Sequence, residues 1–341
     1  MAPAIRRQSG PFRIGDRVQL TGPKARMHTV TIQPDAIFHT HRGMIAHNDL
    51  IGLPDGSVLT STTGDEYLAL RPLLSDYIMS MPRGAAIIYP KDAAQILALG
   101  DIFPGATVIE AGVGSGGLSL WLLRAIGETG TLTSFERRED FAAIARANIE
   151  TFLGAAPDNW TVTVGDLTEE LPAHTTPGSV DRIVLDMLAP WECLEACAEA
   201  LTPGGLVLCY IATVTQLSRV AEAIRATGAF TEPDCSETMV RGWHVEGLAV
   251  RPDHRMVAHT GFLLTARRLA PGTTAPLLKR RASKTEFSDE DVEAWTPGSL
   301  GERATSEKRV RKVVRTAQAQ AIHSKTAARP DSATTDTDED N

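Results

Sequence analysis

A glycine-rich loop between a strand and a helix constrains the fold of this chain more than any other feature. Residues 108–120 read VIEAGVGSGGLSL, and Gly112, Gly114 and Gly117 complete the pattern G-x-G-x-x-G. The apolar run TVIEA predicts a strand before the glycines, and the apolar spacing over 117–126 predicts a helix after them. A strand, this loop and a helix together are typical of a nucleotide-binding βαβ unit. The loop alone does not decide which nucleotide cofactor the unit binds.

Strands and helices alternate after this loop. The segments GTLTSFE, WTVTVGD, DRIVLDM and GLVLCYI predict strands, and residues 138–153, 190–201 and 213–227 predict helices. A late strand is predicted in MVAHTGFLLTARR. Alternation of this kind predicts an α/β fold with a mostly parallel sheet. We therefore expect a Rossmann-like catalytic domain over residues 91–270.

The first 90 residues differ in rhythm and in charge. FRIGDRVQLTG and MHTVTIQ alternate polar and apolar residues and end at turn-forming residues, so a small β-rich domain is expected over 1–90. Residues 1–91 carry 10 Lys and Arg against 7 Asp and Glu, whereas the whole chain carries 34 against 42. A basic front segment in an acidic chain favours a polyanionic partner there.

The last segment, residues 271–341, is rich in Ser, Thr, Pro and charge and poor in large apolar residues, which predicts a disordered tail. Within it, EKRVRKVVRTAQAQAIH is compatible with a short basic helix. RNA contact by Lys308 to Arg315 is one interpretation of this run, and a solvated charge run is the favoured one.

Several features point to a cytoplasmic protein without a metal. The chain has no apolar run long enough to span a membrane and no secretory signal, and its four cysteines are interpreted as reduced thiols. His39, His41 and His47 invite a metal-site interpretation, but no third ligand is evident. A structural or phosphate-facing role is favoured for them.

Acidic residues follow three successive predicted strands. Glu136, Asp166 and Asp186 each stand at the end of a strand, as the glycine loop does. In an open α/β sheet, ligands bind outside the carboxyl ends of the strands, so these residues are expected to face one crevice. Glu136 is placed to bind the ribose hydroxyls of NAD or of S-adenosylmethionine. The absence of an evident acid–base pair for hydride transfer favours a methyltransferase over a dehydrogenase.

Five segments together carry a resemblance to a known family. They are VIEAGVGSGGLSL, LDMLAPW, IATVTQL, MPRGAAIIYPKDA and AHTGFLLTARR. With them, residues 10–270 resemble the tRNA (adenine-N1)-methyltransferases that modify position 58, in the single-chain bacterial, actinobacterial form. The resemblance implies a class I S-adenosyl-L-methionine-dependent methyltransferase with a seven-stranded sheet, tRNA as substrate, S-adenosyl-L-homocysteine as product and a homotetrameric assembly.

The resemblance also implies roles for individual residues. The implied cofactor-binding residues are Gly112, Gly114, Ser115, Gly116, Gly117, Leu118, Glu136, Asp166, Leu167 and Asp186. The implied catalytic residues are Asp186, between the cofactor and the target base, and Tyr89 and Tyr210, which line the base pocket. Apart from the resemblance, the charge of the front domain makes its basic residues the candidate RNA contacts: Arg7, Arg13, Arg17, Lys24, Arg26 and Arg42. The run DMLAPW lacks the first proline and the acid of the family's usual run, and Phe141 stands where relatives often have a polar residue.

Adenine N1 has its own in-plane lone pair, so its methylation needs no strong base. The hypothesis is that Asp186 accepts a hydrogen bond from the N6 amino group and stabilises the cation that forms. The target base leaves its stack, and Tyr89 and Tyr210 hold it. Two alternatives stay open: a class I methyltransferase acting on protein, of the isoaspartyl type, and a non-catalytic RNA-binding relative. The Asp186 segment with Pro190 and Trp191 suits a planar base better than a carboxylate acceptor.

Overall fold

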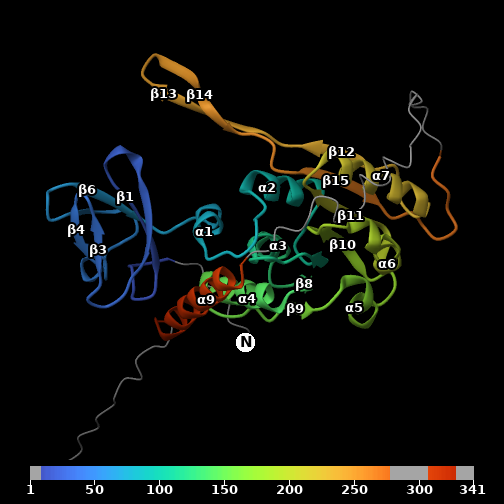
Figure 1. Cartoon of the computed structure of the whole chain (residues 1–341), viewed down its shortest axis with the longest axis horizontal. Coiled ribbons are helices and arrows are strands. Elements are labelled where there is room, and N and C mark those ends of the chain that lie inside the picture. The colour runs from blue at the N-terminus through green and yellow to red at the C-terminus, as the bar shows by residue number, and fades with distance from the viewer. Residues whose placement is uncertain (1–8, 277–305, 328–341) are drawn as a thin grey trace, which may run out of the picture.

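The computed structural model describes residues 9–276 and 306–327, which form two bodies joined by a short helical segment (Figure 1). The N-terminal body contains an antiparallel four-stranded sheet in the order β2-β1-β6-β5 and a separate hairpin, β3-β4. Its strands are β1 (Arg17–Thr21), β2 (Met27–Thr31), β3 (Ile37–Thr40), β4 (Gly43–Ala46), β5 (Ser57–Thr60) and β6 (Glu66–Leu70), with 3-10 turns at Pro23–Ala25 and His47–Asp49. Its core includes Val18, Leu20, Ile32 and Leu50, all buried.

The boundary between the two bodies lies earlier in the chain than residue 90, where the sequence predicted it. Helix α1 (Leu74–Ser80) follows β6, and Leu74, Tyr77 and Ile78 belong to the apolar core of the second body. The Tyr77 hydroxyl donates a hydrogen bond of 2.7 Å to the backbone oxygen of Asn148 in that body. The boundary at residue 90 is thus too late, because apolar packing attaches α1 to the second body.

The second body is a seven-stranded sheet in the order β12-β15-β11-β10-β7-β8-β9. Its strands are β7 (Thr107–Ala111), β8 (Thr131–Glu136), β9 (Trp160–Val164), β10 (Val180–Leu185), β11 (Leu201–Ile211), β12 (Asp234–Glu237) and β15 (Phe262–Arg267). Strands β9, β8, β7, β10 and β11 run parallel, and β15 pairs antiparallel with both β11 and β12. The predicted α/β fold with a mostly parallel sheet is confirmed.

Helices cover both faces of this sheet. Those present are α2 (Pro90–Leu99), α3 (Gly117–Ile126), α4 (Glu139–Leu153), α5 (Leu167–His174), α6 (Leu194–Ala200) and α7 (Val214–Thr227), with a 3-10 turn at Pro190–Cys193. One apolar cluster joins the sheet to α5, α6 and α7, and a second joins it to α1, α2, α3 and α4. The result is a three-layer α/β/α body.

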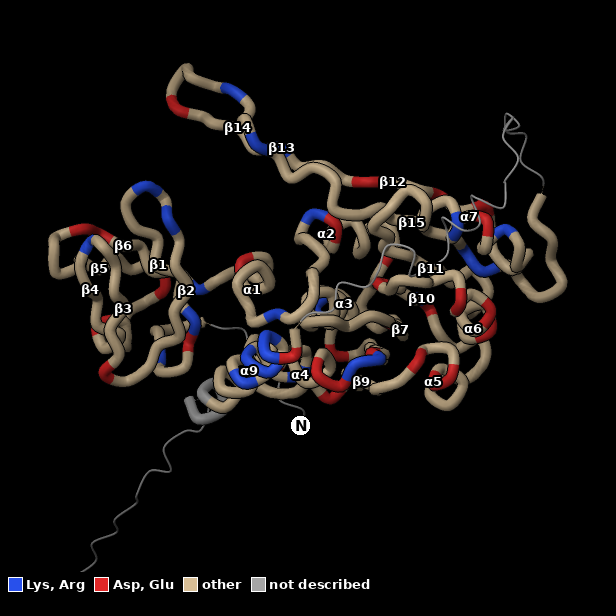
Figure 2. Tube along the Cα trace, viewed as in Figure 1, with Lys and Arg blue, Asp and Glu red and all other residues tan. Residues whose placement is uncertain are grey.

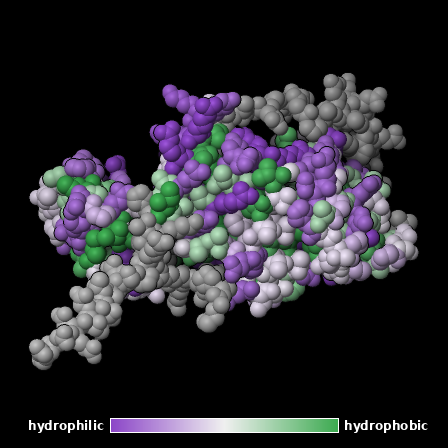
Figure 3. Space-filling view, turned by 90° about the horizontal axis from the view of Figure 1, so that it is seen from below, coloured by the Kyte–Doolittle hydropathy of each residue, from purple (hydrophilic) through white to green (hydrophobic). Residues whose placement is uncertain are grey.

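A long hairpin extends from this body. Strands β13 (Val240–Glu246) and β14 (Ala249–Val257) pair antiparallel and project away from the sheet (Figure 1). The late strand predicted in MVAHTGFLLTARR is therefore divided, since β14 ends at Val257 and β15 begins at Phe262. On the surface of the N-terminal body, apolar side chains gather in the view of Figure 3.

The prediction of a disordered tail is wrong for one segment. Helix α9 (Glu307–Ala327) lies along α4, and Val310, Ala317 and Ala321 are buried against Phe141 and other side chains of that helix. Small side chains at helical spacing let the two backbones approach closely, although the segment has few large apolar residues. The remaining residues of the predicted disordered tail, 277–305 and 328–341, lie outside the described residues.

Candidate active site

The strand register aligns the predicted site residues in one row. Leu185 of β10 pairs with Cys209 of β11 and with Ala111 of β7, and Ala111 pairs with Phe135 of β8. Along the chain, the residues that come directly after Cys209, Leu185, Ala111 and Phe135 are Tyr210, Asp186, Gly112 and Glu136, in that order. Neighbouring strands lie about 4.8 Å apart, so these four residues follow one another across the carboxyl edge of the sheet. We call them the strand-end row.

The glycine loop is held tightly against this row. Gly112 has φ +87°, and a Cβ atom there would lie 1.7 Å from the backbone oxygen of Asp186. The backbone N–H of Asp186 in turn donates to the oxygen of Ala111 at 2.8 Å. Glycine is required at position 112 because no side chain fits between the two strand ends.

Two carboxylates organise the loop from within. Glu136 accepts hydrogen bonds from the backbone N–H of Gly114 at 3.0 Å and of Arg138 at 3.1 Å. Glu110, fully buried, accepts from the hydroxyls of Ser119 and Ser134, both at 2.7 Å. Glu110 has no role among the sequence-based predictions, although its place directly before the glycines was a usable signal.

The loop also contains an unpaired buried hydroxyl. Ser115 is 2% exposed, and its Oγ has no hydrogen-bond partner among the described residues. Leu118 is buried in the core beneath the loop. Ser115 therefore offers a buried donor at the position where the sequence predicts a cofactor, whereas the Leu118 side chain packs into the protein.

The acids of the strand ends perturb one another. Burial raises the pKa of Asp186 to about 7, and the charge of Glu136 adds to the rise. Burial also raises the pKa of Glu110 to about 7, despite its hydrogen bonds from Ser119 and Ser134. Buried acids that titrate near neutral pH gather at functional sites, because structural acids are normally fully solvated or paired.

Asp166 lies at the end of the neighbouring strand β9 and differs from Asp186. It caps α5 by accepting from the backbone N–H of Thr168 at 2.8 Å, and it forms an ion pair with Arg137. Although burial opposes it, these contacts lower the pKa of Asp166. Leu167 is buried in the core, so its side chain does not face the crevice.

The two tyrosines predicted in the base pocket come from different elements. Tyr89 precedes α2, is 37% exposed, and its backbone oxygen accepts from Asp92 and Ala93 of that helix. Tyr210 lies near the end of β11, and a Cβ atom at Gly261 would lie 2.4 Å from its ring. Burial raises the pKa of Tyr210, and the charges of Asp92 and Asp186 act in the same direction. The tyrosine therefore lies within the field of the strand-end acid.

A buried polar cluster that the sequence did not reveal lies behind Tyr210. Asp92 is fully buried and accepts hydrogen bonds from Lys91 Nζ at 2.6 Å, from Thr260 Oγ1 and from the Tyr210 hydroxyl at 3.4 Å. Lys91 also donates to Thr260 at 2.6 Å. No sequence signal links Asp92 to Thr260, which is 168 residues away.

The prediction that Arg17 of the N-terminal body contacts RNA is wrong. Its side chain is buried, donates to Gln320 Oε1 at 3.0 Å and to Ser80 Oγ at 3.4 Å, and lies over the Tyr77 ring. Arg13, Lys24 and Arg26 are exposed, Arg42 pairs with Asp65 at 3.2 Å, and Arg7 lies outside the described residues.

The histidines of the N-terminal body have different environments. His47 is buried, and its Nδ1 accepts from the backbone N–H of Gln33 at 3.2 Å, while His39 lies on β3. Within the described ranges, no three His, Cys, Asp or Glu side chains are grouped so as to hold a metal ion. In the same part of the chain, no helix has the length and apolar character needed to cross a membrane.

Two family models match this chain. The TrmI-like N-terminal model matches residues 10–59, and the model of the tRNA methyltransferase complex GCD14 subunit matches residues 68–250, more than half of the chain. The chain belongs to the GCD14 family. This finding confirms the resemblance drawn from the sequence, and the strand-end row lies within the GCD14 match.

The relatives of this chain agree with its assignment to the GCD14 family. The tRNA (adenine(58)-N(1))-methyltransferase TrmI of Thermus thermophilus is 36% identical over 261 residues, which are 76% of this chain and 97% of that protein. The tRNA (adenine(57)-N(1)/adenine(58)-N(1))-methyltransferase TrmI of Methanocaldococcus jannaschii is 29% identical over 67% of this chain and 87% of that one.

Two solved structures resemble this chain over about the same share of its length as the Thermus relative does. The tRNA (m1A58) methyltransferase TrmI of Aquifex aeolicus has a TM-score of 0.68 at 25% identity and covers 76% of this chain and 100% of its own. A SAM-dependent O-methyltransferase of Thermotoga maritima has a TM-score of 0.72 at 30% identity and covers 77% of this chain and 96% of its own. Helix α9 lies outside the residues that either family model matches.

Proposed function

We propose that this chain transfers a methyl group from S-adenosyl-L-methionine to N1 of adenine 58 in tRNA. The observation that carries the proposal is the strand-end row, in which Asp186 stands between Gly112 and Tyr210. A partly buried acid beside an aromatic ring suits a planar, positively charged product. Membership of the GCD14 family and the 36% identity to the Thermus enzyme support the same reaction.

The residues at the glycine loop fit S-adenosylmethionine. Ser115 offers a buried hydroxyl without a partner among the described residues, Gly112 lets the loop lie directly against the Asp186 backbone with no side chain between them, and Glu136 offers carboxylate oxygens suited to ribose hydroxyls. Asp166 would stand beyond Glu136, toward the adenine, with Leu167 able to contribute only its backbone because its side chain is buried. The cofactor supplies a methyl group that its sulfonium charge activates.

Asp186 would act on the target base. Methylation leaves positive charge on adenine, and an ionised carboxylate that accepts a hydrogen bond from the N6 amino group stabilises that charge. Such preorganised electrostatic stabilisation is commonly the largest catalytic contribution. Because the pKa of Asp186 is raised to about 7, a cationic base and a cationic cofactor would both favour its ionised form.

Tyr89 and Tyr210 would hold the base after it leaves the tRNA stack. Tyr210 is fixed by Asp92 through its hydroxyl, and Asp92 is itself held by Lys91 and Thr260. A ring that is fixed before the base arrives loses little freedom on binding. The buried cluster would therefore position Tyr210 rather than react.

The experiment that tests the proposal is mass mapping of methyl groups on unmodified tRNA incubated with the chain and S-adenosylmethionine. The expected result is one methyl group on adenine 58, and far less methylation in the same time with Asp186→Ala. The same map shows whether position 57 is modified, as the name of the Methanocaldococcus relative states for that protein. Methyl groups found only on protein, or none at all, would contradict the proposal.

Cofactor identity is tested separately by thermal shift. A ligand that binds the folded state raises the unfolding temperature. S-adenosylhomocysteine is expected to raise it and NAD is not. The reverse result would favour a dehydrogenase, and a chain that binds tRNA but neither nucleotide would favour a non-catalytic RNA-binding relative.

We also propose that the chain assembles as a homotetramer through its exposed apolar surfaces. The projecting hairpin exposes several large apolar side chains, among them Trp243 (61% exposed), Val245 and Leu248, and a patch of this kind marks a contact with another protein. Light scattering is expected to give four times the 36.7 kDa mass of the chain. Trp243→Ser is expected to lower that mass, and a monomeric wild-type chain would contradict the proposal.

A cytoplasmic location follows from the proposed substrate, because tRNA is processed there. The N-terminal body is proposed to contact tRNA through Arg13, Lys24 and Arg26, which are exposed. RNA is held largely through phosphates and shape, which exposed cations suit. Replacing these three with Gln is expected to weaken tRNA binding without changing the unfolding temperature.

A further inference from the structure

Helix α9 has two chemically different sides. Val310, Ala317 and Ala321 are buried against α4, while Lys308 and Lys312 are exposed. The helix carries five basic residues among its first nine positions and a single acid, Glu307. Figure 2 shows this concentration of Lys and Arg on α9. One side attaches the helix to the second body, and the other presents positive charge.

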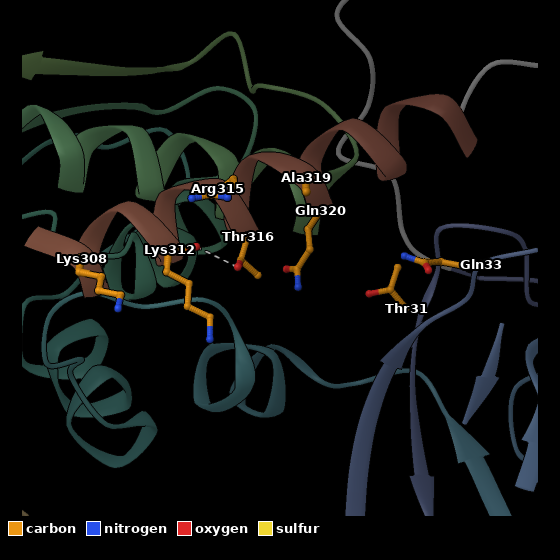
Figure 4. A pocket seen from close by; sticks show the side chains of 8 residues that line it. All are labelled: Thr31, Gln33, Lys308, Lys312, Arg315, Thr316, Ala319 and Gln320. Atoms are coloured by element: carbon orange, nitrogen blue, oxygen red, sulfur yellow. Dashed lines mark hydrogen bonds between the residues drawn. The ribbon is translucent and has the colours of Figure 1, made fainter. Parts of the chain in front are cut away.

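The charged side forms one wall of a groove between the two bodies. The groove has a volume of about 670 Å³. Its lining residues are Lys308, Lys312, Arg315, Thr316, Ala319 and Gln320 of α9, with Thr31 and Gln33 at the end of β2. In Figure 4, Lys308 and Lys312 point away from the helix into open space, and Thr31 and Gln33 lie across from its C-terminal half, on the side of Gln320. We call this cleft the α9 groove.

The position of the groove is fixed by contacts that span the two bodies. Arg17 of β1 donates to Gln320 of α9 at 3.0 Å and also to Ser80 of α1. The α9 helix therefore lies against the N-terminal body as well as against α4. The two walls of the groove come from segments about 300 residues apart in the sequence, as the separation of 303 residues between Arg17 and Gln320 indicates.

The groove differs in charge from the chain as a whole. The chain has a net charge of −8, yet no carboxylate stands among the described residues that line the groove. Within the described part of the chain, Lys308, Lys312 and Arg315 form no ion pair. A polyanion that is repelled by most of the molecule would therefore be attracted here.

We propose that the α9 groove binds a stretch of the sugar–phosphate backbone of the substrate tRNA. This inference rests on the proposed function for the identity of the RNA. Lys308, Lys312 and Arg315 are spaced along about 10 Å of the helix axis, which suits several phosphates better than one small anion. Thr31, Gln33 and Gln320 offer further polar contacts to ribose and phosphate oxygens.

The test compares two double variants of the full chain. Lys308→Gln with Lys312→Gln removes two charges from the groove, and Arg309→Gln with Arg311→Gln removes two charges from the same turns, at residues that do not line it. The groove variant is expected to raise the Kd for unmodified tRNA roughly tenfold, and the control less than about twofold. The slope of log K against log salt is expected to fall by about 1.5 in the groove variant only.

Four measurements show whether the loss of tRNA affinity has another cause. Unfolding temperature and S-adenosylhomocysteine binding should match the wild type in both variants, and Lys308→Arg with Lys312→Arg should retain tRNA affinity. In the unsubstituted chain, bound tRNA should protect Lys308 and Lys312 from acylation. Lysines that stay reactive in the tRNA complex would overturn the proposal without any substitution.

The remaining outcomes are also decisive. Equal losses in both double variants would show a general field effect, and a changed molecular mass with unchanged tRNA affinity would show contact with a second copy; either overturns the α9 groove as an RNA site. If the wild type methylates adenine 58 while the groove variant binds normally, the groove proposal fails alone. If no methylation occurs but the groove variant still loses tRNA affinity, the proposed function fails alone.

Discussion

The strand-end row and the α9 groove are built in opposite ways. The row is assembled by backbone register: Asp186, Gly112 and Glu136 each follow a paired residue on neighbouring strands. The groove is assembled by docking, because packing on α4 and the hydrogen bond from Arg17 of β1 hold α9 beside the N-terminal body. The row contains buried and partly buried acids, and the groove contains exposed cations. The comparison teaches that the chemistry depends on the sheet, whereas the proposed hold on RNA depends on how separate elements pack.

The largest expected effect separates catalysis from RNA binding. Asp186→Ala is expected to lower kcat on unmodified tRNA by about 10²–10³, since it removes a preorganised charge at the reacting base. The tRNA Kd should change little, because the cations that attract RNA lie elsewhere. Steady-state kinetics and filter binding measure the two quantities. Asp158→Ala, at an exposed acid outside the row, is the control, and near-normal turnover by Asp186→Ala would contradict the role.

A second change tests how tightly the row is packed. Gly112→Ala places a Cβ atom 1.7 Å from the Asp186 oxygen, so we expect a loss of about 3 kcal/mol in the free energy of unfolding. Gly154→Ala is the matched control, because φ there is +84° but nothing lies within 4 Å, and about 1 kcal/mol is expected. Urea denaturation measures both. Equal losses would mean that backbone conformation, and not the contact with Asp186, requires glycine at position 112.

A third change undocks the helix and leaves the row intact. Ala317→Asp buries a carboxylate against α4, which is costly, so α9 should detach and exchange its amide hydrogens quickly. Affinity for tRNA should fall roughly tenfold, as in the groove variant, while S-adenosylhomocysteine binding is retained. Gln318→Asp, at an exposed position on the same helix, should leave α9 docked. Unchanged tRNA affinity with a detached α9 would separate the helix from RNA binding.

The smallest expected effect is on pH dependence. If only ionised Asp186 is active, kcat/KM should fall about fivefold from pH 7 to pH 6, because its pKa is raised to about 7. Stability should change in the opposite sense. The folded state retains a proton that the unfolded chain loses near its ordinary pKa of 3.8, so this contribution is full below that value and is lost as pH rises through about 7. Both dependences should weaken in Asp186→Asn, and an unchanged acid limb in that variant would assign it to another group.

Local patterns were sufficient where neighbours in sequence make the structure. The glycines predict the start of α3 at Gly117, and the apolar stripe predicts α4, which spans Glu139–Leu153. The strand-end acids follow from the same patterns, because a residue directly after a parallel strand must lie at the carboxyl edge of the sheet. The RNA role expected for Arg17 failed for the same local reason, since a charge in a strand does not reveal which element will cover it.

The α/β class, the glycine loop and the acids that follow the strands could be predicted from local patterns, because periodicity and turn chemistry act over a few residues. Three features could be seen only in the folded chain: α1 joins the second body, Lys91 and Thr260 surround Asp92, and α9 docks on α4. These contacts link segments that are distant in the chain. Their stability comes from burial and from hydrogen bonds that form only after the sheet has brought both partners together.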